Sequence, residues 1–457
     1  MKLQTPIVDP MQPSKSKGIH LSAQSGKNPA GSVYRLCSVP GYIQTINSWQ
    51  RPDTIKHIIR RNSMDNFIYS IPTTAYFGKG QIGILGETIK ARGGSKVLLA
   101  YGGGSIRTNG IYDAILAQLG KAGLAHAELA GIMPNPRVES VEEGIRIYRE
   151  KGCDFILAVG GGSTLDACKA IAAGVMYDGP VTDLFVNESG LSNIKAAAPL
   201  ATVLTMAGTG SEMDMGAVIT VGEHHKKEVV MHPLVNPVFS ILDPEYTFTV
   251  PEYHSMAGVA DILCHLMEQY FTPDVNAKVQ DRMNEGVMKV VMEDATKILA
   301  DPKDYDARAN IMWASSMALA GFQFLLGKPG FPFPLHGMGH ELSSKYDMTH
   351  GVTLALLTPS WMRHTMKKAP QYLPVFARFA RNVMDIREED DAKAAEDGVK
   401  KLEAFYAAIK MPENLREAGV KKEDLASMAE KAVERGNLGI LTSIGREEAL
   451  QIMNDAF

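Results

Sequence analysis

The chain has 457 residues, of which 45% are hydrophobic and 21% charged, with a formal net charge of −4. This composition is that of ordinary globular chains and excludes collagen-like, low-complexity and broadly disordered proteins. The charge gives no general attraction to nucleic acid or acidic membranes, and no apolar run is long enough to predict a transmembrane helix. Four cysteines without a C-x-x-C pair are too few for a disulfide scaffold, so a reducing cytoplasm is the expected compartment.

The first 63 residues differ in charge from the rest of the chain. They contain nine Lys or Arg but only Asp9 and Asp53 as acids, which gives +7 here and leaves −11 for the remainder. The segment is rich in Ser, Pro, Gly, Gln and Asn and has no sustained period. We expect residues 1–63 to be a disordered extension or to precede the true start at Met64, with a basic targeting peptide as the alternative.

From Met64 onward, short apolar runs alternate with amphipathic segments. The predicted strands are 95–100, 154–159, 200–205 and 238–242, and the predicted helices are 111–121, 140–151 and 164–173. Strands that alternate with helices and end in polar glycine turns indicate a mostly parallel α/β sheet. We therefore expect an α/β domain over residues 64–245.

After about Pro244 the strand patterns almost vanish. Helical spacing is found over 251–271, 275–299, 305–326, 335–345 and 352–368, and in Ala-, Glu- and Lys-rich segments further on. The sequence therefore predicts an all-helical second domain over residues 246–457.

Three glycine-rich turns follow the predicted strands: Gly102–Ser105, Gly160–Ser163 and Gly208–Ser211. Backbone N–H groups at a helix N-terminus attract anions, and glycines let a pyrophosphate approach closely. A plain tight turn is the alternative for any single loop, and the spacing is not that of the G-x-G-x-x-G fingerprint. Taken together, the turns predict a dinucleotide. The candidate contacts in the first two turns and their vicinity are Gly103, Gly104, Ser105, Gly161, Gly162, Ser163 and Asp166.

The first turn bears on the choice of cofactor. An acid near this strand end can bind the ribose 2′-hydroxyl of NAD and repel a 2′-phosphate. Here the strand ends in small residues, with Arg107 nearby and Asp113 as the next acid. NADP(H) is therefore favoured over NAD(H).

Five candidate metal ligands occur at two places in the helical half. Asp261 and His265 are spaced i, i+4, so they share one helix face, and His336 and His340 have the same spacing. His350 follows ten residues later. One carboxylate and several imidazoles suit a single divalent transition metal, although an individual histidine is more often a hydrogen-bonded core or surface residue. Spacing alone makes His336 and His340 the natural pair. We expect His224 and His225 to form a surface turn.

Together these motifs resemble the iron-containing (group III) alcohol dehydrogenases. Within that family the chain looks like the NADPH-dependent butanol dehydrogenase and aldehyde reductase branch, and the likeness is good from Met64 to about Trp361. The branch-like features are Phe77–Gly80, Tyr101–Ser105, Pro134–Pro136, Gly160–Lys169 and Asp243–Tyr246. An extension such as residues 1–63 is normally absent from the family.

The resemblance implies a role for each candidate residue. Asp261, His265, His336 and His350 would bind Fe²⁺ or Zn²⁺, and His340 would instead be the histidine beside the nicotinamide and substrate, where it relays a proton. The residues placed around the cofactor are Asn135, Gly162, Ser163, Thr205, Thr209 and Lys227. The resemblance also implies a dehydroquinate synthase-like architecture, with an α/β dinucleotide-binding domain followed by a helical metal-binding domain, and a homodimer.

The expected substrate is a short-chain aliphatic alcohol or aldehyde such as butanol or butanal. Phe331–Leu335, with Phe322, Phe324 and Leu325 before it, suggests an apolar pocket. A glycerol dehydrogenase-like polyol oxidoreductase would need more polar walls. A non-redox lyase resembling dehydroquinate synthase would need several Lys or Arg. A metal-binding protein without catalysis would leave the three glycine turns unexplained.

Overall fold

The computed structural model describes residues 63–186, 192–222, 226–330 and 332–457, without the side chain of Phe322. Residues 1–62 lie outside this part, as do His224, His225 and Phe331, so the expectations for them stay predictions. The described residues all belong to one compact unit.

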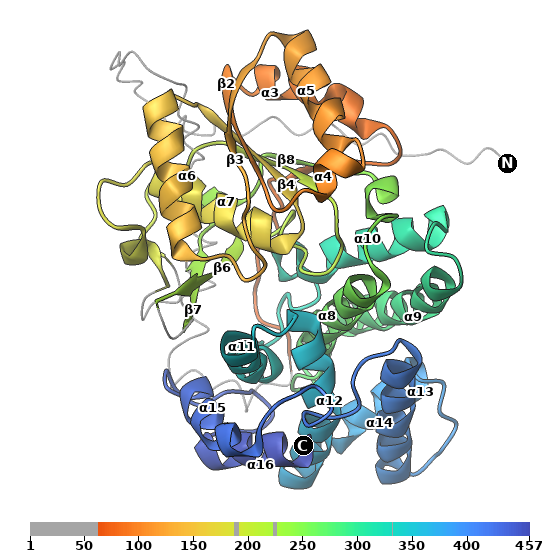
Figure 1. Ribbon diagram of the computed structural model, residues 1–457. Helices are drawn as coiled ribbons and strands as arrows, with labels where there is room; N and C mark the ends of the chain where they lie inside the picture. The colour runs from red at the N-terminus through yellow and green to blue at the C-terminus, as the bar shows by residue number, and fades with distance from the viewer. Residues whose placement is uncertain (1–62, 187–191, 223–225, 331) are drawn as a thin grey trace, which may run out of the picture. The chain divides into compact units, whose positions relative to one another are not determined.

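The N-terminal half is built on a six-stranded sheet in which every pair of neighbouring strands is parallel (Figure 1). In spatial order the strands are β1 (Thr74–Phe77), β8 (Phe239–Leu242), β5 (Leu200–Leu204), β4 (Phe155–Gly160), β2 (Lys96–Tyr101) and β3 (Ala125–Leu129). The chain runs outward from β2 to β3 and then returns to β4 on the other side of β2. This reversal puts the carboxyl ends of β2 and β4 at the point where open α/β sheets bind their ligands.

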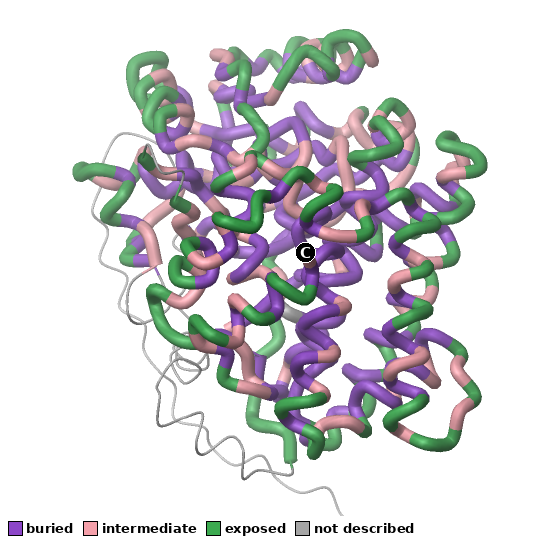
Figure 2. The backbone as a smooth tube through the Cα atoms, turned by 60° about the horizontal axis from the view of Figure 1, so that its bottom comes forward, coloured by how far each residue is buried: buried purple, intermediate pink, exposed green. Residues whose placement is uncertain are grey.

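Helices cover both faces of this sheet, which explains why the central strands are apolar throughout. Alternate residues of a strand enter different cores: Leu98 and Ile156 pack with α6 (Val138–Lys151) and α7 (Gly162–Gly174). Leu99 and Leu157 pack with α3 (Leu85–Ala91) and α5 (Ile111–Ala122). Figure 2 shows the resulting buried layer in purple. Strands buried on both faces read as continuous hydrophobic runs, and this is why four of them were predicted.

Several elements of this half were not predicted. The edge strands β1 and β3 have exposed residues and lack an apolar run. The antiparallel hairpin of β6 (Gly216–Val221) and β7 (Lys226–Met231), the helix α3 and the four-residue helix α4 (Ser105–Thr108) were also missed. Edge strands carry a weaker hydrophobic signal because one side of the ladder faces solvent.

Beyond β8 the described residues form helices and turns with no further strand. The helices are α8 (Glu252–Tyr270), α9 (Lys278–Ala300), α10 (Tyr305–Leu319), α11 (Pro334–Tyr346), α12 (His350–Lys368), α13 (Leu373–Asn382), α14 (Asp391–Ala408), α15 (Leu425–Ala432) and α16 (Arg446–Asp455). The α/β-plus-helical fold class is thereby confirmed. The predicted helix over 305–326 was too long, because Gly321 has a φ of 57° and breaks the helical path after Leu319.

The predicted domain boundary after residue 245 falls between the end of β8 and the start of α8. No helix among the described residues combines the length and the apolar character that crossing a bilayer requires.

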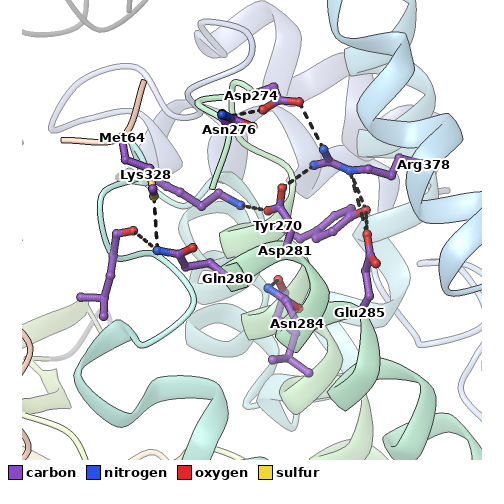
Figure 3. A network of polar contacts seen from close by, with 12 residues as sticks. Met64, Tyr270, Asp274, Asn276, Gln280, Asp281, Asn284, Glu285, Lys328 and Arg378 are labelled. Atoms are coloured by element: carbon purple, nitrogen blue, oxygen red, sulfur yellow. Dashed lines mark hydrogen bonds and ion pairs between the residues drawn. The ribbon is translucent and has the colours of Figure 1, made fainter. Parts of the chain in front are cut away.

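A polar network fixes the beginning of the described chain against the helical half (Figure 3). Gln280 of α9 donates to the Leu326 carbonyl and contacts the sulfur of Met64. Further along α9, Asp281 pairs with the buried Lys328 at 2.6 Å. Glu285 accepts a hydrogen bond of 2.7 Å from the Tyr270 hydroxyl. None of these side chains belongs to the histidine cluster described below.

Candidate metal and cofactor site

The five predicted metal-site candidates come from three helices that meet in the core. α8 carries Asp261 and His265, and it is buried from Ser255 to Tyr270. His336 lies in the first turn of α11, and His350 is the first residue of α12. Both histidines therefore lie at or near the amino-terminal end of a helix, and their ring centroids are 5.1 Å apart.

The donor atoms of this cluster converge on one point. The ligand atoms of Asp261, His336 and His350 all lie within 4.8 Å of one another. His265 Nδ1 and His350 Nε2 are each 3.9 Å from Asp261 Oδ1, and the His265 ring stacks on His336 with centroids 4.5 Å apart. His340 also lies nearby, with its ring 5.1 Å from that of His350, but it is not part of the converging group.

The cluster fits a divalent cation. Asp261 Oδ1, His265 Nδ1 and His336 Nε2 are buried, and none has a hydrogen-bond partner among the described residues. Buried polar atoms are rarely left unsatisfied, and a cation bound at the cluster would give them a partner. The set of one carboxylate and imidazoles suits Fe²⁺ or Zn²⁺.

The pKa shifts at the cluster keep most of its imidazoles neutral, and they disfavour an uncompensated charge on Asp261. Burial lowers the pKa of His265 and of His350 well below the usual histidine value, with neighbouring histidines adding to the effect. Burial also lowers the pKa of His340 to about 3. These imidazoles are therefore neutral at neutral pH, and a neutral imidazole is the form that binds a metal. Burial raises the pKa of Asp261 to about 7, so an uncompensated charge is costly there.

Sequence reasoning missed Glu268, which contacts one of the candidate ligands. It follows Asp261 and His265 on the same face of α8, and its carboxylate contacts His336 Nδ1. The signal was present in the i, i+4, i+7 spacing of three polar residues in the largely apolar part of the helix.

α8 and α12 approach each other closely because Gly351 follows His350. A Cβ atom at Gly351 would lie 1.9 Å from the Ala257 carbonyl oxygen and 3.1 Å from the Asp261 nitrogen. Only glycine, which has no Cβ atom, allows the backbones of the two helices to lie this close. The backbone at position 351 therefore sets how near His350 comes to Asp261.

The predicted cofactor residues gather at the carboxyl ends of neighbouring strands. Gly103, Gly104 and Ser105 follow β2, Gly161, Gly162 and Ser163 follow β4, and Thr205 and Thr209 follow β5. α7 begins at Gly162 directly after β4, so its first N–H groups face this edge of the sheet. A Cβ atom at Gly162 would lie 2.4 Å from Thr209 Oγ1, which shows how closely the second and third glycine turns pack.

Asp166 is engaged within the protein. Its two carboxylate oxygens accept hydrogen bonds from Ser211 Oγ at 2.7 Å and from the Val218 N–H at 2.9 Å. These bonds tie the third glycine turn and β6 to α7. Its predicted role at the cofactor stays a prediction, and the structure adds this positioning role.

A second group of predicted cofactor residues links the two halves of the chain. Lys227 of β7 donates to Asn135 Oδ1 at 2.6 Å and to Thr220 Oγ1 at 3.1 Å. Asn135 in turn donates to Asp347 Oδ1 at 2.8 Å, and Asp347 lies three residues before His350. No sequence pattern predicts that Asp347 joins this group, because the contact crosses from the sheet half to the loop between α11 and α12.

Arg107, which entered the argument for NADP(H), is already paired. Its guanidinium donates to the Tyr101 hydroxyl and to Glu128 Oε2 at 3.0 Å, and it lies over the ring of Tyr112 at 4.0 Å. Glu128 is on β3, an edge strand that the sequence pattern did not predict, and it brings an acid to the end of β2.

The apolar residues predicted to line the substrate pocket lie in different environments. Phe333 is near the cluster, with its ring centroid 5.8 Å from that of His336. Phe324 and Leu325 are buried and almost inaccessible to solvent.

Comparison with known proteins agrees with this geometry. Residues 72–244 match the iron-containing alcohol dehydrogenase family, and residues 255–457 match the C-terminal domain of the same family. NADH-dependent butanol dehydrogenase A from Clostridium acetobutylicum is 43% identical over 397 residues, which are 86% of this chain and 100% of that protein. The chain belongs to the iron-containing alcohol dehydrogenase family.

Two further similar proteins are an aldehyde reductase and a butanol dehydrogenase of known structure. The NADPH-dependent aldehyde reductase YqhD from Escherichia coli is 36% identical, over 85% of this chain and 97% of that protein. The crystal structure of NADH-dependent butanol dehydrogenase A from Thermotoga maritima superposes with a TM-score of 0.82 at 33% identity, covering 86% of this chain and 99% of that one.

This iron-containing alcohol dehydrogenase is therefore an oxidoreductase with alcohol dehydrogenase or aldehyde reductase activity, as predicted. The family implies a divalent metal and a nicotinamide cofactor. The relatives do not agree on the cofactor, because some are named for NADH and one for NADPH.

Proposed function

We propose that the protein reduces short-chain aliphatic aldehydes, or oxidises the corresponding alcohols, with NADP(H) and one divalent metal. The observation that carries this proposal is the convergence of Asp261, His336 and His350, with His265 beside them, on a buried point where several donor atoms have no partner. The names of the relatives support butanol or butanal as the substrate class.

Asp261, His265, His336 and His350 would hold Fe²⁺ or Zn²⁺. The metal supplies Lewis acidity that polarises an alcohol or carbonyl oxygen, and the nicotinamide supplies or accepts the hydride. Asp261 contributes the one negative charge of the ligand set, and because its carboxylate is buried, its attraction to a bound cation would be stronger than in water. The apolar ring of Phe333 beside His336 favours an aliphatic substrate over a polyol.

His340 is the proposed proton relay. It lies beside His350 but outside the group of converging ligand atoms, and its low pKa keeps the imidazole neutral, with a free nitrogen lone pair, at neutral pH. It would take the proton released from an alcohol, or return one to the product of aldehyde reduction.

The glycine turns would hold the cofactor phosphates. An added Cβ at Gly103 or Gly104 would meet nothing within 4 Å, so this turn leaves open space beside the predicted ribose site. That space supports NADP(H) over NAD(H). Glu128 weakens this preference, because its carboxylate is already paired with the guanidinium of Arg107.

The direct test is oxidation of NADPH and NADH with butanal by metal-stripped protein and by protein reloaded with Zn²⁺ or Fe²⁺. We expect turnover only after reloading and a higher kcat/KM with NADPH. A higher kcat/KM with NADH would overturn the cofactor preference and leave the rest standing. Turnover of glycerol but not of butanal would favour the polyol alternative. Absence of turnover with both metals, both cofactors and a panel of short aldehydes would overturn the substrate proposal.

Lys227 predicts a pH dependence of cofactor binding. Burial and Arg137 lower its pKa to about 8, while Asp347 and Asp166 act in the other direction. The ammonium is charged below this pKa and neutral above it, so a charge-assisted contact to the cofactor is present at about pH 7 and lost by about pH 10. Such a contact contributes about 1.5–3 kcal/mol, so the Kd for NADPH should rise by roughly 10-fold or more over this interval.

The matched variant is Lys227→Arg, whose guanidinium stays charged throughout this range. Fluorescence titration with NADPH should show that its Kd does not rise in the same interval. A rise of equal size in the variant would assign the pH dependence to another group.

The homodimer and the cytoplasmic location expected from the sequence remain proposals. Light scattering of the purified protein tests the first, and fractionation of the source cells tests the second.

A further inference from the structure

Glu268 makes two contacts that concern the same short stretch of chain. Its Oε1 accepts a 2.6 Å hydrogen bond from the Leu335 N–H, in the first turn of α11. Its Oε2 contacts His336 Nδ1. The Glu268 side chain is buried completely, and the Cys264 sulfur lies 3.8 Å from Oε2 as a weak third donor.

The first contact fixes where α11 begins. The first N–H groups of a helix have no partner within the helix, and a side-chain oxygen usually provides one. Phe333 precedes α11 and offers no capping side chain. A carboxylate from α8 does so instead, and its negative charge is favourable at this end of the helix dipole.

The second contact fixes the tautomer of His336. A carboxylate only accepts hydrogen bonds, so Nδ1 must carry the proton that faces Glu268. Nε2 then keeps its lone pair. This Nε2 is the buried atom without a partner that faces Asp261 and His350 in the cluster.

Glu268 also lines a small hollow together with Phe271, Trp361 and residues 439–442. Apart from these contacts, the Glu268 carboxylate is surrounded mainly by apolar groups.

We propose that Glu268 is a positioning residue that holds His336 in the orientation and tautomer needed to bind the metal through Nε2. This inference rests on the metal site proposed above. In this proposal α8 carries Asp261 and His265 and, through Glu268, also orients His336 on α11.

The decisive variant is Glu268→Gln, which keeps the size and shape of the side chain but has a single acceptor oxygen. If that oxygen accepts from Leu335, the amide NH₂ faces His336 Nδ1. The ring must then carry its proton on Nε2, where it blocks the metal. If the oxygen accepts from His336 instead, the NH₂ meets the Leu335 N–H and leaves that buried donor unpaired. Glutamine therefore cannot satisfy both donors.

The experiment measures Zn²⁺ affinity of the full chain by competition with a chromophoric chelator, together with thermal unfolding of the metal-free protein. We expect both Glu268→Gln and Glu268→Ala to weaken Zn²⁺ binding by about 10-fold to 100-fold, as loss of a partner of a metal-bound histidine commonly does. The control is Glu285→Gln, another buried carboxylate in the helical half (Figure 3), which accepts from Tyr270 and contacts none of the cluster. It should keep the affinity of the unchanged protein.

A role in packing alone would be preserved by glutamine and lost in alanine. Glu268→Gln with unchanged Zn²⁺ affinity therefore overturns the proposal, even if it lowers the unfolding temperature. Failure of the unchanged protein to bind Zn²⁺ or Fe²⁺ would overturn the metal site itself, and the inference with it. Weak binding in both Glu268 variants, with normal binding in the Glu285 control, supports the proposal.

Discussion

His350→Ala should remove most of the bound metal and lower aldehyde turnover by about 100-fold or more. His350 Nε2 is 3.9 Å from Asp261 Oδ1, and the converging group of three donors would lose one member. Changes to the partners of metal ligands already cost about 10-fold to 100-fold, so loss of a ligand should cost at least as much. Metal content by elemental analysis and kcat/KM with butanal measure the two effects.

The same helix supplies the control. His364 lies further along α12, is also buried, and has an Nε2 without a partner among the described residues, but it is absent from the cluster. His364→Ala should retain the metal and its activity. If His350→Ala kept full metal content and turnover, His350 would not be a ligand, and the site would have to be rebuilt around the other histidines.

The second large effect is expected for Gly162→Ala at the start of α7. The new Cβ would lie 2.4 Å from Thr209 Oγ1 and 2.5 Å from its Cγ2, so the glycine turns after β4 and β5 must separate. Such overpacking costs about 1–3 kcal/mol. If that cost falls on the cofactor-binding geometry, the Kd for NADPH should rise by roughly 5-fold to 150-fold. Fluorescence titration with NADPH measures it, and metal content should stay unchanged.

Gly120→Ala is the matched control for this change. Gly120 is inside α5 of the same half, and a Cβ there would meet nothing within 4 Å. Its cofactor affinity should equal that of the unchanged protein. Equal affinity in Gly162→Ala would show that the turn after β4 does not touch the cofactor phosphates.

The two experiments also separate the halves of the site. The metal variant should still bind NADPH, because its changed residue is on α12, whereas the glycine variant should still bind metal. Loss of both ligands in either variant would indicate general unfolding, which thermal denaturation would reveal.

Much of the fold could be predicted from local hydrophobic patterns in the sequence. The runs that became β2, β4, β5 and β8 are apolar because helices cover both faces of the sheet, so each was visible in the sequence. The edge strands β1 and β3 were not visible, because partial exposure leaves short strands without an apolar run. The end of α10 was misplaced because apolar residues continue past Gly321, where a backbone angle interrupts the helix.

The sequence by itself determined the donor types of the site and the pairing of Asp261 with His265, because residues four apart share one face of a helix. Only the tertiary structure decided which donors meet. It gathers His336 and His350, fourteen positions apart, with Asp261 and leaves His340 beside them, although His336 and His340 have the helical spacing. It also placed Glu268 against His336 and Asp347 against Asn135. Helical periodicity fixes neighbours within one helix, whereas contacts between helices depend on packing, here on the close approach of α8 and α12 that glycine at position 351 permits.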